Sequence, residues 1–174
     1  MSRFLPGQPL GIKWGQFNPA ATTIEVFVDF VCPFSNRIVG NLKEVAAEYG
    51  DQVNIVFFIV PQPWHPQGSI IAECFLAAAS IAPESTSKLL TATFDAFHTN
   101  RFQDVPSYDM SRHDFHKAFA ELYNETCGVP PEKLLEAVEI KQGTGEFALH
   151  HGNGATRLLK FYVKLHRQLG VHVT

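Results

Sequence analysis

The strongest constraint on the fold is a strand, a helix and a second strand that follow one another within residues 22–60. TTIEVFVDF (22–30) and VNIVFFIV (53–60) have the apolar, β-branched composition of buried strands. The segment between them begins at Pro33, which suits a first helical turn because no N–H is needed there, and Gly50 supplies its end. Such a βαβ unit is parallel and right-handed, so the sequence predicts an α/β fold at its start.

Within that helix, apolar residues recur every three or four positions, and we expect them to form its buried face. They are Phe34, Ile38, Leu42, Val45 and Tyr49.

The remaining segments complete the predicted domain organisation. Residues 1–23 are rich in Pro and Gly and predict an extended lead-in, and residues 24–66 hold the βαβ half. Helical spacing dominates residues 67–169, which indicates a mainly helical insertion whose last helix we expect over about 145–169. Residues 170–174, GVHVT, have the composition of the start of another strand.

Start signals support individual helices of this insertion. Ser111 with Asp114 three residues later predicts one helix start, and the pair Pro130 and Pro131 predicts another. GNGATR (152–157) resembles a phosphate-binding glycine loop, but no strand precedes it, so a helix start is preferred.

Charge and hydropathy exclude several classes of protein. The net charge of −3 leaves no excess of basic residues for binding nucleic acid. No apolar run reaches the length of a membrane helix, and the N-terminal residues lack the apolar core of a signal peptide, so we expect no membrane association and a cytoplasmic, reducing compartment. Cys32, Cys74 and Cys127 form no C-x-x-C pair, so a disulfide framework is not expected.

Cys32 stands where a buried strand meets a helix. Unpaired N–H groups and the positive end of the helix dipole at that position favour a thiolate over a thiol, which makes Cys32 a candidate nucleophile. Ser35 lies on the same side of the first turn and could donate to the sulfur, but it cannot resolve a mixed disulfide. A reaction at Cys32 would therefore need an external thiol, in practice glutathione. The alternative is a small apolar residue that is buried and inert.

DFVCPFSNRIV after an apolar strand, the second strand, the helical insertion and the terminal GVHVT together resemble the DsbA-like branch of the thioredoxin superfamily, over about residues 20–174. The resemblance implies a thioredoxin-like fold with a helical insertion and a C-P-x-C active site, in which Cys32 matches the nucleophile and Ser35 replaces the resolving cysteine. Kappa-class glutathione transferases are similar in plan, with a serine in place of Cys32.

The resemblance also implies a cis-proline directly after Thr174, which the sequence does not contain. We therefore expect a fold truncated before that strand, with an unpaired sheet edge that invites self-association. If the protein continues past Thr174, we expect Val173 and Thr174 to lie beside Cys32 and, with Pro33 and Phe34, to contact glutathione or a thiol or disulfide protein substrate.

Other polar residues were weighed for function. Asp29, three residues before Cys32, is interpreted mainly as a strand end that satisfies backbone N–H groups. Trp64 and His65 should emerge at the same sheet edge as Cys32, and His65 could pair with the thiolate or contact substrate. Cys74 lies on an apolar helical stripe and is expected in the core, whereas Cys127 is expected in a loop.

The eight histidines invite a metal hypothesis, but neither HDFH (113–116) nor His150 with His151 matches a zinc spacing, so no metal and no bound cofactor are expected.

Three functions remain open from the sequence. The first is a monothiol, DsbA-like thiol-disulfide oxidoreductase with Cys32 as nucleophile and glutathione as the resolving thiol. The second is a kappa-like glutathione transferase, and the third is a binding module without catalysis.

Overall fold

The computed structural model describes residues 4–5, 8–9, 11–99, 101–146, 148–149 and 151–171. Its strands are β1 (Phe4–Leu5), β2 (Gln8–Pro9), β3 (Ile12–Trp14), β4 (Thr22–Val28) and β5 (Val53–Ile59). Its α-helices are α1 (Pro33–Tyr49), α2 (Gly68–Ile81), α3 (Thr86–His98), α4 (Arg112–Cys127), α5 (Pro131–Val138) and α6 (Thr156–Gln168), with short 3₁₀ turns at Gly50–Gln52 and Pro83–Ser85. Val173 and Thr174 lie outside the described residues.

The central sheet has the order β3-β5-β4. Strands β4 and β5 are parallel, in register from Thr22 opposite Val53 to Val28 opposite Ile59, so the predicted βαβ unit is confirmed. β3 adds an antiparallel strand on the other side of β5, within the predicted lead-in. The sequence interpretation missed β3 because it is only three residues long and is flanked by Gly11 and Gly15.

The predicted buried face of α1 is largely wrong. Phe34 is 61% exposed, Tyr49 50% and Ile38 38%, and of the predicted face only Leu42 is buried. The other buried residues of α1 are Ser35, Asn36 and Val39. The junction with β4 determines which face of α1 is buried, because a hydrogen bond from the backbone of Asp29 holds Ser35 inward. Val39 and Leu42 follow Ser35 at helical spacing and therefore also face the sheet.

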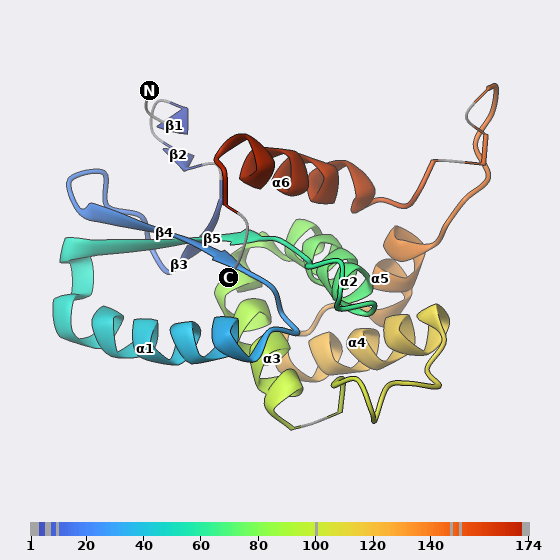
Figure 1. Cartoon of the computed structure of the whole chain (residues 1–174), viewed down its shortest axis with the longest axis horizontal. Coiled ribbons are helices and arrows are strands. Elements are labelled where there is room, and N and C mark those ends of the chain that lie inside the picture. Colours follow the sequence, from blue (N-terminus) through green and yellow to red (C-terminus); the bar gives the residue numbers. More distant parts are fainter. Residues whose placement is uncertain are drawn as a thin grey trace.

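Helices cover both faces of the sheet (Figure 1). α1 runs along one side of the strands, α6 crosses the other side, and α2 to α5 form a helical body at the end where β4 and β5 finish. Tyr162 of α6 packs edge-on against Phe58 of β5, with ring centroids 6.1 Å apart. The mixed α/β architecture with a helical insertion agrees with the predicted fold class.

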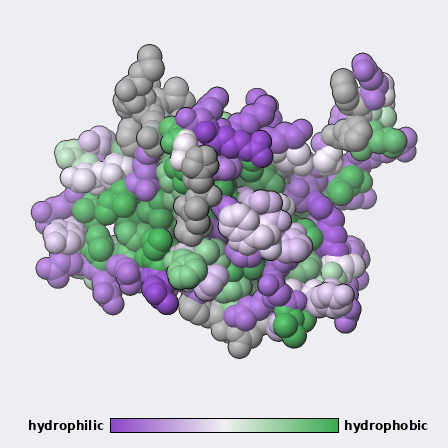
Figure 2. Space-filling model, in the orientation of Figure 1, coloured by the Kyte–Doolittle hydropathy of each residue, from purple (hydrophilic) through white to green (hydrophobic). Residues whose placement is uncertain are grey.

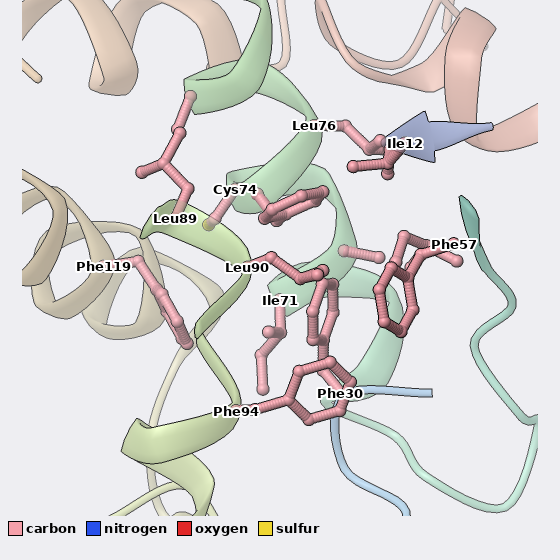
Figure 3. Packing of buried hydrophobic residues seen from close by; sticks show 14 of the residues in the cluster. Ile12, Phe30, Phe57, Ile71, Cys74, Leu76, Leu89, Leu90, Phe94 and Phe119 are labelled. Atoms are coloured by element: carbon pink, nitrogen blue, oxygen red, sulfur yellow. The ribbon is translucent and has the colours of Figure 1, made fainter. Parts of the chain in front are cut away.

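The insertion and the sheet share one hydrophobic core (Figure 3). Phe30, just after β4, packs against Phe75 of α2 and Phe94 of α3, each with ring centroids 5.0 Å apart. Cys74 lies among Leu89, Leu90 and the neighbouring aromatic rings, fully buried as predicted. The insertion is therefore continuous with the βαβ half and is not a separate body.

The start signals of α4 and α5 are confirmed. The backbone N–H of Asp114 donates to Ser111 Oγ at 3.2 Å, and the N–H of Ser111 donates to the Asp114 carboxylate at 2.9 Å, which completes a capping box. α5 begins at Pro131.

The last helix was predicted too long. α6 begins at Thr156 and not near residue 145, because Gly145 and Gly152 adopt left-handed backbone angles (φ of 77° and 68°) that break a helix. No helix within the described ranges is long and apolar enough to cross a membrane.

Candidate functional site

Cys32 caps the N-terminus of α1 with an extended backbone (φ −77°, ψ 122°). Its carbonyl accepts the N–H of Asn36 at 3.1 Å, and its own N–H donates to the carbonyl of Asp29 at 3.2 Å. The residue is 6% exposed. This is the position predicted for Cys32, at the positive end of a 17-residue helix.

Ser35 is completely buried one turn into α1. Its Oγ accepts a hydrogen bond from the backbone N–H of Asp29 at 3.1 Å. The hydroxyl therefore joins the end of β4 to the helix, and donation from Ser35 to the sulfur of Cys32 stays a prediction.

Asp29 is the centre of a buried hydrogen-bond network and is only 1% exposed. Its carboxylate accepts the N–H groups of Val31 at 3.0 Å and Gln62 at 2.8 Å, and Oδ2 lies 2.7 Å from Nδ1 of His65. The interpretation of Asp29 as an acceptor for nearby backbone N–H groups is thus confirmed. A carboxylate only accepts, so the proton of this pair belongs on Nδ1 of His65.

The start of α2 approaches the same carboxylate. A Cβ at Gly68 would lie 3.2 Å from Asp29 Oδ1, so glycine lets the helix N-terminus come close to the buried charge. The positive end of the α2 dipole there stabilises that charge.

His65 was expected to pair with the thiolate of Cys32 or to contact substrate, and its hydrogen-bond partner is Asp29. Asp29 in turn bonds to the backbone of Cys32, so both belong to one cluster. Gln62, which donates its N–H to Asp29, was missed, because nothing in PQPWHPQG distinguishes a backbone donor.

Two exposed aromatic residues adjoin members of this cluster in the sequence, Phe34 near Cys32 and Trp64 next to His65. Phe34 is 61% exposed and Trp64 is 59% exposed. The guanidinium of Arg37 lies 5.8 Å from the centre of the Phe34 ring, and the Trp64 ring meets that of His65 edge-on at 6.0 Å. Exposed rings beside a buried cysteine offer a surface for an apolar part of a substrate.

Cys74 and Cys127 lie outside the cluster around Cys32 and Asp29. Cys74 is fully buried, and burial together with the neighbouring Glu73 carboxylate raises the pKa of its thiol far above the ordinary value. Cys127 is half-buried at the end of α4, not in a loop as expected, and the three cysteines form no disulfide. No group of three His, Cys, Asp or Glu side chains that could hold a metal ion occurs among the residues that the structure describes.

Comparisons with solved structures identify similar folds. A crystal structure of a candidate protein-disulfide isomerase from Pseudomonas syringae superposes with a TM-score of 0.67 at 25% sequence identity, over 94% of this chain and 83% of the other. The thiol-disulfide exchange protein α-DsbA2 from Wolbachia pipientis gives a TM-score of 0.62 at 15% identity, over 91% and 70% of the two chains. BdbD from Bacillus subtilis gives 0.62 at 16% identity, over 95% and 78%. No protein-family model matches the sequence, and no curated protein sequence matches it.

Proposed function

This chain has the DsbA-like fold of the thioredoxin superfamily, and from that fold we propose that it is a monothiol thiol-disulfide oxidoreductase with Cys32 as its nucleophile. The observation that carries the proposal is the position of Cys32, at the N-terminus of α1 and directly after the strand that pairs in parallel with β5. The positive end of the helix dipole at that position favours a thiolate.

The reaction begins when the Cys32 thiolate attacks one sulfur of a substrate disulfide. A bond forms between the Cys32 sulfur and the attacked sulfur, and the other sulfur leaves as a thiolate that takes a proton from water. Ser35 offers a hydroxyl where a resolving thiol would stand, so Cys32 remains in the mixed disulfide until another thiol arrives.

We propose glutathione as that resolving thiol. With a glutathionylated protein as substrate, Cys32 takes the glutathionyl group and releases the protein thiol. A glutathione thiolate then attacks the sulfur of the bound glutathionyl group, which regenerates Cys32 and forms oxidised glutathione. Because this cycle consumes reduced glutathione, the proposal places the protein in a reducing compartment such as the cytoplasm.

The proposed substrate contacts are Pro33 and Phe34 beside the sulfur, His65 from the β5–α2 turn, and Val173 and Thr174. Pro33 and Phe34 are exposed, as a docking surface requires. The 61% exposure of the Phe34 ring gives an apolar contact next to the reacting sulfur.

The test measures the alkylation rate of Cys32 against pH in a Cys127→Ala variant, with and without glutathione. Cys74 stays in place because it is buried and has a strongly raised pKa. A rate midpoint well below the free-thiol value of about 8.5, with protection by glutathione, is expected. A midpoint at or above that value without protection overturns the proposal and favours a binding module without catalysis.

The reaction product distinguishes a kappa-like glutathione transferase from the proposed oxidoreductase. Incubation with glutathione and an electrophilic aryl halide would then give a thioether conjugate, which mass spectrometry detects. Formation of oxidised glutathione from a glutathionylated peptide, without conjugate, supports the oxidoreductase.

A further inference from the structure

A pocket of about 500 Å³ lies beside the Asp29–His65 pair, where the β5–α2 turn faces α6. One wall is the turn itself, which contributes Trp64, His65 and three prolines. The opposite wall is the last part of α6, which contributes His166 and Arg167. The pocket is therefore formed by two segments that are distant in the sequence. In Figure 1 the turn follows the end of β5, below α6.

The titratable side chains that line this pocket are all basic. They are Arg167, His65 and His166, and no Asp or Glu is among the lining residues. The chain as a whole has a net charge of −3, so this local excess of basic groups is not a property of the surface in general. The Asp29 carboxylate, which His65 contacts, is not among the lining residues and already accepts two backbone N–H groups.

Arg167 is exposed and forms no salt bridge with any residue that the structure describes. Arg167 lies in the last turn of α6, where a basic residue complements the helix dipole. The helix dipole does not explain why the other titratable residues of the pocket are also basic. The guanidinium is a planar donor that matches a carboxylate in two hydrogen bonds. Trp64 adds an aromatic face, and the prolines make the wall rigid, so little conformational entropy is lost on binding.

We propose that this pocket binds a carboxylate of the disulfide partner, with Arg167 as its main contact. The proposal rests on the function proposed above and names the substrate class: disulfides with a carboxylate close to the reacting cysteine. An acidic residue of a protein and a carboxylate of glutathione share this chemistry.

Asp29 connects the pocket to Cys32. His65 lines the pocket and contacts the Asp29 carboxylate, and the carbonyl of Asp29 accepts the N–H of Cys32 at 3.2 Å. The proposal therefore requires a substrate that reaches from the Cys32 sulfur to the pocket, and an extended peptide advances by about 3.3 Å per residue.

The experiment compares two mixed disulfides of short peptides with the neutral leaving group 2-thiopyridine, identical except for Glu or Gln next to the cysteine. Release of the thione reports the attack by Cys32 in a Cys127→Ala background. The Glu peptide is expected to react about three- to tenfold faster than the Gln peptide. Arg167→Gln should bring this ratio close to one, whereas Lys164→Gln, an exposed cation on α6 outside the pocket, should leave it unchanged.

Equal rates for the two peptides, or a ratio that survives in Arg167→Gln, overturn the inference. A second pair, the 2-thiopyridine disulfides of glutathione and of its dimethyl ester, shows whether glutathione or an acidic peptide is the preferred source of the carboxylate. If neither peptide reacts, the proposed function fails. The pocket is then tested separately by the fluorescence of Trp64 in a Trp14→Phe variant, with an acidic peptide that has no cysteine. Quenching that Arg167→Gln abolishes supports the pocket. If the peptide causes no quenching, the pocket is rejected.

Discussion

The backbone N–H of Asp29 donates a hydrogen bond to Ser35 Oγ at 3.1 Å, and this bond joins the end of β4 to the first turn of α1. In the proposed function Ser35 stands where a resolving cysteine would be, and in the structure it also holds this junction together. Ser35 is thus a structural acceptor for the segment that joins β4 to Cys32.

Ser35→Cys should create a C-x-x-C pair that closes an intramolecular disulfide and turns over without glutathione. Sulfur is a weaker hydrogen-bond acceptor than a hydroxyl oxygen, so the reduced variant should also lose about 0.5 to 1.5 kcal/mol of unfolding free energy. Thiol counting and urea unfolding measure the two effects.

Ser35→Ala is the matched control, because it removes the acceptor without adding a thiol. It should lose about 1 to 3 kcal/mol of unfolding free energy, because the buried N–H of Asp29 is left without an acceptor, and should gain no glutathione-independent turnover. A Ser35→Cys variant that folds yet stays as dependent on glutathione as the parent would contradict the assignment of Cys32 as a nucleophile in an intact groove.

Asp29→Asn should destabilise the fold by about 1 to 3 kcal/mol, because an amide cannot accept from all the buried donors that the carboxylate serves. His65→Gln should cost less, since His65 is one of three partners. A double-mutant cycle between the two, measured by urea unfolding, should give a coupling energy of about 0.5 to 3 kcal/mol.

Asp51→Asn serves as the comparison, since Asp51 is an exposed carboxylate beside the start of β5. Its effect should stay within about 0.5 kcal/mol. Additive effects of Asp29→Asn and His65→Gln would show that their 2.7 Å contact carries no energy of its own.

The sequence predicted those parts of the fold that depend on local patterns. The apolar runs of β4 and β5, the Pro33 start of α1 and the Ser111–Asp114 capping box are each read from a few neighbouring residues. Cys32 was placed correctly for the same reason, since a strand followed by Cys-Pro fixes it at a helix start.

The parts that were missed depend on contacts between distant segments. The buried face of α1 is set by Ser35 bonding back to Asp29, and Phe34 and Tyr49 are left exposed although they fit an apolar stripe. The Asp29–His65 contact joins residues 36 positions apart, which no spacing rule predicts. The same holds for Arg167, which reaches the pocket only because α6 folds back over the β5–α2 turn.

His116 should make stability depend on pH. It is 6% exposed on α4, and burial, with further contributions from Arg112 and His113, lowers its pKa from 6.5 to about 4. Between these values the unfolded chain binds more protons than the folded one, so stability is fully present above pH 6.5 and is lost as the pH falls toward 4. One pKa unit corresponds to about 1.4 kcal/mol, so the loss should reach about 2 to 3 kcal/mol.

Urea unfolding at pH 7 and pH 4.5 measures this loss, and His116→Gln should reduce it. His113→Gln changes an exposed histidine of the same helix, and the loss of stability between pH 7 and pH 4.5 should remain nearly as in the parent. Equal pH dependence in the parent and in both variants would show that His116 titrates normally in the folded state.

Cys74 should report global unfolding. Its side chain is fully buried between α2 and α3, and its raised pKa leaves it as a thiol at neutral pH. In a Cys32→Ser, Cys127→Ala variant, alkylation of Cys74 should follow the unfolded fraction as urea increases, with the same midpoint as the loss of helical circular dichroism. Fast labelling in the absence of urea would mean that the helical insertion opens locally.

Self-association should involve the β4 side of the sheet. In the described part of the chain β4 pairs with β5 and with no other strand, and hydrophobic residues gather between the strands and α1 (Figure 2). An edge strand with exposed backbone groups beside an apolar surface is a template for a second chain. Sedimentation velocity over a range of concentrations should therefore show dimers or larger species.

A charge on this edge should weaken the association. Ile24 of β4 is half-buried, so Ile24→Lys can extend its ammonium group into water while it opposes strand pairing with another copy. Val105→Lys is the matched control, because Val105 is an apolar residue that is 87% exposed and lies outside the sheet. A parent chain that sediments as a monomer at all concentrations would contradict the prediction. Equal dissociation by both lysine variants would show that association depends on general hydrophobicity and not on the edge of β4.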